Sequence, residues 1–283
     1  MTAGIPYAEV IGDPIAHSKS PLIHKFWLER LGLPGDYRAT RVGPDDLADY
    51  LENRRRDPLW RGCNVTMPLK LAIPALLDAH RLPEHADEPV NLVTCGAGLL
   101  NGTNTDVRGL LDPLRALDQG RLSWIGDGAA NTPRNAVILG SGGVLHSVVR
   151  VLHSLGYRPI TVVARSEAKL RALLGAAARD IAYLPWETPL PASDLLVNAT
   201  PLGMAGHEAM PYDAGALRED GILFEMIYLP LVTPLLASAR TRGRRVVDGL
   251  QMLVAQAAPS FEALFGTAPP REHDSELRAL LTA

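Results

Sequence analysis

The stretch that decides the fold is AVILGSGGVL, residues 136–145, in which a short apolar run leads directly into a glycine-rich turn beginning at Gly140. The apolar run predicts a buried strand, and the pattern after the turn predicts a helix that extends to Leu155. Residues without a Cβ allow a tight turn here, and they let backbone N–H groups approach a pyrophosphate at the helix N-terminus. The stretch therefore predicts a βαβ dinucleotide-binding unit, although Leu145 replaces the third glycine of the usual G-x-G-x-x-G pattern.

The strand that follows indicates which dinucleotide is bound. Sites for NAD place Asp or Glu near the end of this strand, where the carboxylate binds the ribose 2′-hydroxyl. Here the strand expected at 160–164 is followed by Arg165 and Ser166, with Lys169 about one helical turn later. A guanidinium forms bidentate hydrogen bonds with phosphate, so these donors favour the 2′-phosphate of NADP. The alternative is that both cations are simply solvated.

Short apolar runs alternate with helical patterns along most of the chain, which is typical of an α/β fold with a largely parallel sheet. Further strands are expected at 7–11, 37–42, 62–65, 195–198, 222–225 and 246–247, and helices from 20 and at 44–53, 69–79 and 249–265. The stretch 118–135 is polar and is expected to be a loop or linker. We therefore predict two domains: residues 1–106 plus 249–283 for substrate binding and catalysis, and residues 107–248 as a Rossmann-type nucleotide-binding domain.

Composition limits the classes of partner. The net charge of −3 over 283 residues argues against nucleic acid or a membrane surface as a partner. No apolar run approaches the roughly 20 residues of a membrane helix, and no signal peptide is recognisable, so we expect a cytoplasmic protein. Its partner is expected to be a small-molecule substrate, with the chain as a monomer or a homodimer. Cys63 and Cys95 form no CxxC pair or zinc cluster; we expect reduced thiols and no metal, with a disulfide as the alternative. The basic run 54–56 is expected to be the cationic end of a helix.

The segment 12–21 carries a polar cluster at a predicted strand-to-helix junction. It places Ser18 and Ser20 two residues apart, with Pro21 directly after them. Hydroxyl groups beside a helix N-terminus suit a substrate carboxylate. The alternative for Ser20 is simple N-capping of the helix.

A second polar cluster surrounds Lys70, at the start of the helix expected at 69–79. A cation at a helix N-terminus is mildly unfavourable, which indicates an anionic partner or a functional lysine. Asp106, which follows a glycine-containing stretch expected to be a turn, is the candidate partner.

Taken together, these segments resemble the shikimate dehydrogenase family over residues 8–258. The pieces that carry the resemblance are GDPIAHSKSPLIH at 12–24, NVTMPLK at 64–70, NTD at 104–106, NATPLGM at 198–204 and DGLQMLVAQAA at 248–258. The resemblance implies two α/β domains and the NADP-dependent, reversible reduction of 3-dehydroshikimate to shikimate in aromatic amino acid and chorismate biosynthesis.

Position by position, the resemblance also implies roles for single residues. Lys70 would transfer the proton and would be paired with Asp106. The implied substrate ligands are Ser18, Ser20 and Tyr228 for the carboxylate, and Thr66, Asn91, Asp106 and Gln256 for the ring hydroxyls. The implied cofactor contacts are Gly140, Ser141, Gly142, Gly143 and Val144 at the pyrophosphate, Ala164, Arg165, Ser166 and Lys169 at the adenosine end, and Thr200, Met226 and Gly249 at the nicotinamide.

The chain departs from the family pattern at Leu92, Val107, Ala164 and Glu225, where Thr, Gly, Asn and Asp are usual. These departures leave two alternatives open. One is a paralogue that acts on quinate or an amino-shikimate, and the other is a nucleotide-binding regulator that has lost catalysis. The intact set of Ser18, Ser20, Lys70 and Asp106 favours a ring carboxylate, with shikimate first.

Overall fold

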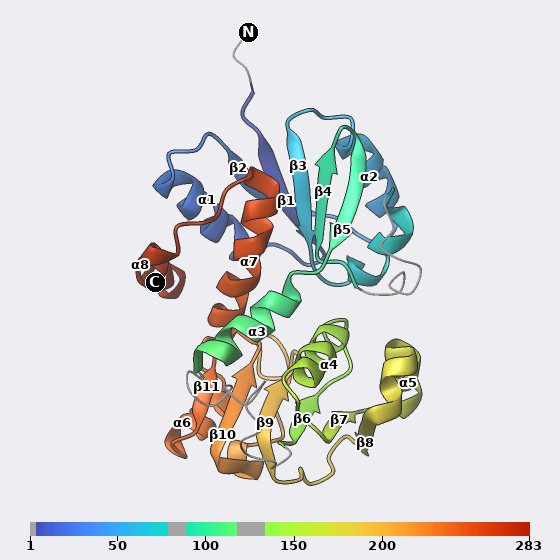
Figure 1. Ribbon diagram of the computed structural model, residues 1–283, viewed down its shortest axis with the longest axis vertical. Coiled ribbons are helices and arrows are strands. Elements are labelled where there is room, and N and C mark those ends of the chain that lie inside the picture. The colour runs from blue at the N-terminus through green and yellow to red at the C-terminus, as the bar shows by residue number, and fades with distance from the viewer. Residues whose placement is uncertain (1–3, 79–88, 118–133) are drawn as a thin grey trace. The chain divides into compact units, whose positions relative to one another are not determined.

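The computed structural model describes residues 4–78, 89–117 and 134–283. The chain divides into two compact units, one of residues 1–108 and 253–283 and the other of residues 109–252 (Figure 1). The boundaries expected from the sequence, at 106/107 and 248/249, lie close to these. The expected loop at 118–135 falls almost entirely outside the described residues.

The first unit is built on a five-stranded sheet of order β2-β1-β3-β4-β5. Its strands are β1 (Tyr7–Gly12), β2 (Asp36–Arg41), β3 (Trp60–Val65), β4 (Leu92–Gly96) and β5 (Leu99–Thr103). The first three are parallel, as expected, but β4 and β5 form an antiparallel hairpin that the sequence reasoning missed. The expectation of a turn before Asp106 is therefore wrong, because Gly102 lies inside β5.

Side chains of β1 alternate between two apolar layers, as the period of a strand requires. Tyr7 and Ile11 belong to the cluster that includes residues of α2 (Leu47–Arg54), whereas Ala8 and Val10 pack in the cluster with Leu264 of α7 (Gly249–Phe265). Figure 1 shows α1 (Ser20–Arg30) beside α7, and α8 (Asp274–Thr282) packs against α1. The sheet is thus covered on both faces.

The helix expected at 69–79 is not an α-helix. Within the described residues, two 3₁₀ turns replace it, η1 (Leu69–Leu71) and η2 (Ile73–Leu76). Pro74 explains the difference, because proline lacks the N–H that an α-helix needs and disfavours the α conformation in the residue before it.

The second unit contains a parallel sheet of order β11-β10-β9-β6-β7-β8. Its strands are β6 (Ala136–Leu139), β7 (Ile160–Ala164), β8 (Ile181–Pro185), β9 (Ser193–Asn198), β10 (Leu217–Glu225) and β11 (Arg245–Val247). Numbered from β6, this is the 3-2-1-4-5-6 order of a doubly wound dinucleotide-binding fold, which confirms the predicted fold class. Only β8 was absent from the sequence expectation.

The helices of the second unit are α4 (Leu145–Ser154), α5 (Glu167–Leu174) and α6 (Pro234–Thr241), and α3 (Asp106–Leu117) begins in the first unit and continues into this one. Short 3₁₀ turns are η5 (Gly175–Asp180) and η6 (Ala214–Ala216) here, and η7 (Arg271–His273) precedes α8. In this order the chain reverses direction between β6 and β9, so the glycine turn after β6 lies at the switch point where such sheets bind ligands.

Cys63 and Cys95 are both free thiols, so the disulfide alternative is wrong. The helix α2 ends at Arg54, as the basic run predicted, although these arginines also form ion pairs with Glu9, Glu52 and Asp78. In the part of the chain that is described, no helix is long and apolar enough to cross a membrane.

Candidate active site

Lys70 and Asp106 form a largely buried ion pair in the first unit. The Lys70 Nζ lies 2.6 Å from Asp106 Oδ2, and the two side chains are 17% and 7% exposed. Asp106 is the first residue of α3, where the helix dipole stabilises an anion. Its backbone N–H donates to Asn104 Oδ1 at 2.9 Å, which fixes the start of the helix. Asp106 is therefore the anionic partner that the position of Lys70 predicted.

Asn91 orients the carboxylate of Asp106. Its Nδ2 donates to Asp106 Oδ1 at 2.8 Å and to Thr105 Oγ1 at 3.0 Å, and its Oδ1 accepts the Thr105 N–H at 2.7 Å. Both amide hydrogens of this buried side chain are used in this way, so Asp106 turns its other oxygen to Lys70. The neighbouring Leu92, where the family has threonine, packs in the apolar layer with Ala8 and takes no part in this arrangement.

The sequence reasoning missed three buried polar side chains that complete this cluster, Asn64, Thr105 and Ser260. The Ser260 Oγ accepts from Asn64 Nδ2 at 2.8 Å and lies 3.1 Å from Thr105 Oγ1. Thr105 also donates to Gln256 Oε1 at 3.3 Å. Ser260 lies in an apolar helical stretch, and only the packing of α7 on the sheet brings it to the cluster, so no local sequence pattern indicated it.

Ser18, Ser20 and Thr66 follow the ends of two neighbouring strands. β1 and β3 are parallel and in register from Ala8↔Gly62 to Ile11↔Val65, so the segments after them leave the sheet at one edge. A Cβ at Gly12 would lie 2.5 Å from Thr66 Cγ2, so only glycine allows this close approach. The hydroxyls of Ser20 and Thr66 bond to none of the described residues, which leaves them available to a ligand.

The N-cap of α1 differs from the expectation by one residue. The helix begins at Ser20 itself, Lys19 precedes it, and no side chain caps the helix in the usual way. The Ser18 Oγ instead accepts the Ser20 N–H at 3.3 Å. Ser20 is thus not the N-cap residue, and its hydroxyl is not used for capping.

The glycine turn of the second unit fits a bound pyrophosphate. Gly140 has a φ of 102°, and a Cβ there would lie 2.7 Å from Thr200 Cγ2, so no other residue fits. A Cβ at Gly142 or Gly143 would meet nothing within 4 Å, which leaves the backbone of the turn open before α4. Leu145, in place of the third glycine, is fully buried and is therefore accommodated by the core.

The end of β7 fits a phosphate rather than a ribose hydroxyl. Arg165 and Lys169 are exposed, and neither side chain has a partner among the described residues. Ser166 is the N-cap of α5, where its Oγ accepts the Lys169 N–H at 3.3 Å. No carboxylate lies at the strand end itself, as the sequence indicated, and Glu167 in the first turn of α5 pairs with Arg171 at 3.0 Å. The carbonyl of Ala164 accepts a hydrogen bond from the Tyr183 hydroxyl at 3.2 Å.

Glu225 joins three segments at the carboxyl ends of β9 and β10. It accepts hydrogen bonds from Asn198 Nδ2 at 2.8 Å, from Thr233 Oγ1 at 2.7 Å and from the Ile227 N–H at 3.2 Å. Burial raises the pKa of this carboxyl, and the hydrogen bonds offset only part of that effect. Asn198 in turn accepts from Thr200 Oγ1 at 2.8 Å, so glutamate in place of aspartate still fixes Thr200 against the glycine turn.

The remaining expected residues of the second unit lie beside this junction. Met226 follows Glu225 directly, and a Cβ at Gly249 would lie 2.5 Å from the Ile227 carbonyl carbon, so the backbones pack closely. Tyr228 is half-buried, burial raises the pKa of its phenol, and its hydroxyl has no partner among the described residues.

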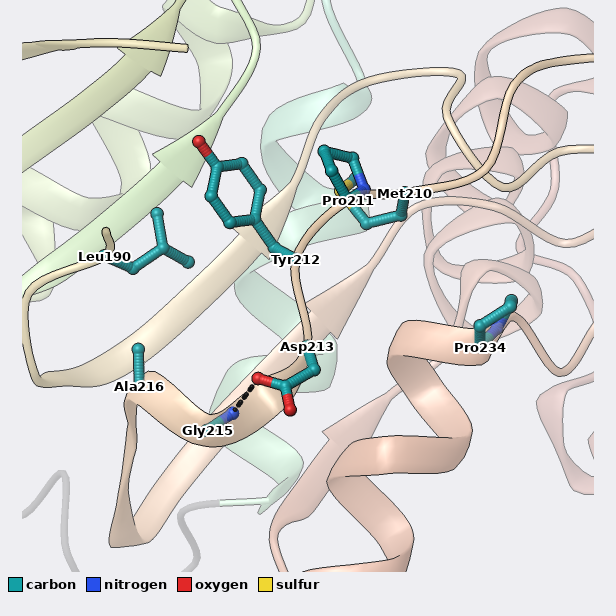
Figure 2. A pocket seen from close by; sticks show the side chains of 8 residues that line it. All are labelled: Leu190, Met210, Pro211, Tyr212, Asp213, Gly215, Ala216 and Pro234. Carbon is teal, nitrogen blue, oxygen red and sulfur yellow. Dashed lines mark hydrogen bonds between the residues drawn. The ribbon is translucent and has the colours of Figure 1, made fainter. Parts of the chain in front are cut away.

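A separate pocket lies elsewhere in the second unit (Figure 2). It is lined by Leu190, Met210, Pro211, Tyr212, Asp213, Gly215, Ala216 and Pro234. None of the expected site residues is among them. Asp213 Oδ1 accepts the Gly215 N–H at 2.8 Å, and Asp213 also pairs with Arg242, so its carboxylate serves the local fold.

The doubly wound sheet, its glycine turn and the buried lysine–carboxylate pair are features of pyridine-nucleotide-dependent dehydrogenases. Residues 10–93 match the model of the shikimate dehydrogenase substrate binding domain. The chain is 44% identical to the shikimate dehydrogenase (NADP(+)) of Sphingopyxis alaskensis over 279 residues, which cover 98% of this chain and 97% of that protein. The chain belongs to the shikimate dehydrogenase family.

Solved structures agree with this assignment. Shikimate 5-dehydrogenase from Thermus thermophilus, in complex with NADP(H) and shikimate, is 33% identical with a TM-score of 0.80, over 98% of this chain and 100% of that one. Quinate dehydrogenase from Corynebacterium glutamicum, in complex with NAD, is 26% identical with a TM-score of 0.81, over 98% and 99% of the two chains. Both relatives share the fold over nearly their full length.

Proposed function

We propose that this chain catalyses the NADP-dependent, reversible reduction of 3-dehydroshikimate to shikimate, as a step of chorismate and aromatic amino acid biosynthesis. The observation that carries the proposal is the buried pair of Lys70 and Asp106, at 2.6 Å, in a member of this family. The first unit is then the substrate domain and the second the NADP domain. A cytoplasmic monomer or homodimer is part of the same proposal.

NADPH, when bound, supplies the hydride, and the chain supplies position, charge and a proton. The Lys70 ammonium donates a proton to the ketone oxygen as it becomes an alkoxide, and in the reverse direction Lys70 accepts it. Asp106 holds Nζ in place for that transfer, and Asn91 holds Asp106. A positioned acid of this kind contributes about 10²–10⁴-fold in rate.

The other polar groups bind and orient. The hydroxyls of Ser18, Ser20 and Tyr228 hold the substrate carboxylate, and Thr66, Asp106 and Gln256 hold the ring hydroxyls. Asn91, which the sequence also placed at a ring hydroxyl, uses both amide hydrogens within the protein and acts through Asp106. On the cofactor side, the turn from Gly140 through Ser141, Gly142 and Gly143 to Val144 takes the pyrophosphate. Ala164, Arg165, Ser166 and Lys169 surround the 2′-phosphate end, and Thr200, Met226 and Gly249 lie along the nicotinamide. The open turn and the unpaired cations support these assignments.

A second candidate is the oxidation of quinate, because the fold is shared with a quinate dehydrogenase. The discriminating experiment assays shikimate, quinate and an amino-shikimate, each with NADP and with NAD. We expect the highest kcat/KM for shikimate with NADP. A higher value for quinate with NAD would replace the proposal, and no turnover in any assay would favour the regulator.

The preference for NADP should depend on Arg165. We expect Arg165→Ala to raise the KM for NADP by about 10- to 100-fold, the contribution of a hydrogen bond between charged groups, and to change the KM for NAD little. Arg179→Ala is the matched control, because Arg179 is an exposed cation before β8, at the opposite end of the same parallel strands. Equal effects of Arg165→Ala on both cofactors would contradict the 2′-phosphate contact.

The carboxylate contact should depend on Ser18. We expect Ser18→Ala to raise the KM for shikimate by about tenfold, because one hydrogen bond to a carboxylate is lost, and to leave the KM for NADP unchanged. With shikimate methyl ester, which lacks the carboxylate charge, the difference between Ser18→Ala and the wild type should shrink. An effect confined to NADP would remove Ser18 from the substrate site.

A further inference from the structure

Lys19 lies between Ser18 and Ser20, and a lysine in that position is the obvious cation for a substrate carboxylate. Its Nζ has a different partner. It donates to the backbone carbonyl of Leu281 at 2.6 Å, in the last turn of α8. The carbonyls of a last helical turn have no donor within the helix, and the helix dipole favours a cation there. Lys19 thus caps the C-terminal end of α8.

A second contact joins the opposite ends of the same two helices. Arg30, in the last turn of α1, forms an ion pair with Glu276, in the first turn of α8. α8 therefore runs antiparallel to α1, with Lys19 tied to its end and Arg30 tied to its beginning. Leu277 and Leu281 are both buried, and they anchor α8 in the first unit. Leu277 follows Glu276 directly, and Leu281 is the residue whose carbonyl binds Lys19.

The Arg30–Glu276 pair and the Lys19–Leu281 bond differ in their exposure to solvent and in the segment that they attach to α8. Arg30 and Glu276 are both more than a third exposed, so their ion pair contributes little to stability. The bond from Lys19 is partly buried, and it acts on the residue between the two serines. Ser18 accepts the Ser20 N–H, its own N–H donates to the Ile15 carbonyl at 3.0 Å, and Ser20 begins α1. The bond from Lys19 to Leu281 adds an attachment of this segment to α8.

We propose that Lys19 is a positioning residue: by capping α8 it fixes the segment that carries Ser18 and Ser20, so α8 is part of the substrate-carboxylate site without touching substrate. The inference rests on the proposed function. In this proposal the ammonium of Lys19 does not contact the substrate. The hydroxyls of Ser18 and Ser20 form the hydrogen bonds to the carboxylate, and α8 determines where the two serines lie.

Steady-state kinetics test the proposal. We expect Lys19→Met to raise the KM for shikimate about three- to tenfold, the size of one hydrogen bond's net contribution, with kcat and the KM for NADP unchanged. Lys19→Arg should restore the wild-type KM, because a guanidinium also donates to a carbonyl. Lys25→Met is the control, since Lys25 is an exposed cation of the same helix that pairs with Asp36. A KM for shikimate that is unchanged in Lys19→Met would overturn the proposal.

A double-mutant cycle separates positioning from direct contact. Leu277→Ala loosens α8 at a buried residue, so it should raise the KM for shikimate as Lys19→Met does. Lys19→Met should then add little in the Leu277→Ala background, because both changes act through one attachment. If Leu277→Ala leaves the KM unchanged while Lys19→Met raises it, or if the two effects add in full, Lys19 acts on the ligand and the proposal is wrong.

Hydrogen exchange tests the attachment without any substrate. In Lys19→Met we expect faster amide exchange in α8 and in the peptide that contains residues 15–20, and unchanged exchange in the second unit. Leu277→Ala should accelerate exchange in the same two segments. Unchanged exchange at residues 15–20 in both variants would overturn the proposal even if the wild-type protein proved inactive toward shikimate, so its failure is distinct from failure of the proposed function.

Discussion

Lys70→Met should lower kcat for shikimate oxidation by about 10²–10⁴-fold and change the KM for shikimate far less. The methionine fills most of the space of the lysine but has no proton to exchange with the alkoxide, so the loss falls on the chemical step. Lys70 is largely buried beside Asp106 at 2.6 Å, so the substitution removes the ammonium from the position where the proton is transferred. The measurement is kcat and KM in both directions of the reaction.

Stability must be separated from catalysis in this variant. Removal of Lys70 leaves the carboxylate of Asp106, which is 5% exposed, with the hydrogen bond from Asn91 but without its cation. Breaking a buried pair from one side costs about 3–5 kcal/mol of folding free energy. The double variant Lys70→Met/Asp106→Asn removes the unpaired charge as well, so it should regain stability without regaining kcat. Unchanged turnover in Lys70→Met would remove Lys70 from the mechanism.

The fold could be predicted where a segment's own pattern determines its structure. The strand 136–139, the glycine turn after it and the helix 249–265 were predicted with the observed bounds, because apolar periodicity and glycine act locally. The hairpin of β4 and β5 was missed, since its two-residue turn at Ala97 and Gly98 interrupts a stretch with little alternation. β8 was missed as well, and Ile181 is its one buried residue.

In the candidate site as well, the sequence indicated some residues, whereas others come together only through tertiary packing. Lys70 and Asp106 were paired in advance, although the α-helix whose N-terminal dipole supported that pairing is two 3₁₀ turns in the structure. Thr105 and Ser260 lie far apart in the sequence and meet only when α7 packs on the sheet. The direction of a long side chain is equally hard to foresee. Lys19 lies beside two carboxylate-binding candidates, yet its Nζ binds Leu281, and no local pattern indicates that choice.

A loss of stability as large as that of Lys70→Met should follow from Arg54→Met, at a position outside the candidate active site. Arg54 donates two hydrogen bonds to Glu9, at 2.7 and 3.0 Å, and Glu9 in the middle of β1 is 1% exposed. Among the described residues, the carboxylate then retains Thr40 and Tyr50 as its side-chain donors, so we expect a loss of about 3–5 kcal/mol in the free energy of unfolding. Arg38→Met is the control, because Arg38 pairs with Asp36 at the surface, where such pairs contribute about 0–1 kcal/mol.

The pH dependence of that loss identifies its cause. Burial alone would raise the pKa of Glu9, but the hydrogen bonds from Arg54, Thr40 and Tyr50 outweigh burial and hold the pKa below its usual value. A carboxyl whose folded pKa is lowered stabilises the fold above its unfolded pKa of about 4.3, and this contribution disappears as the pH falls through the folded pKa.

In Arg54→Met the folded pKa of Glu9 should rise, so Glu9 takes up its proton at a higher pH than in the wild type. The difference in unfolding free energy between the two proteins, measured by urea denaturation, should therefore be large near pH 7. It should shrink as the pH falls through the raised pKa of Glu9 in the variant, and it should be much smaller at about pH 3. A difference of equal size at both pH values would mean that Arg54 stabilises the first unit by packing on Tyr7 and Tyr50 rather than through the charge of Glu9.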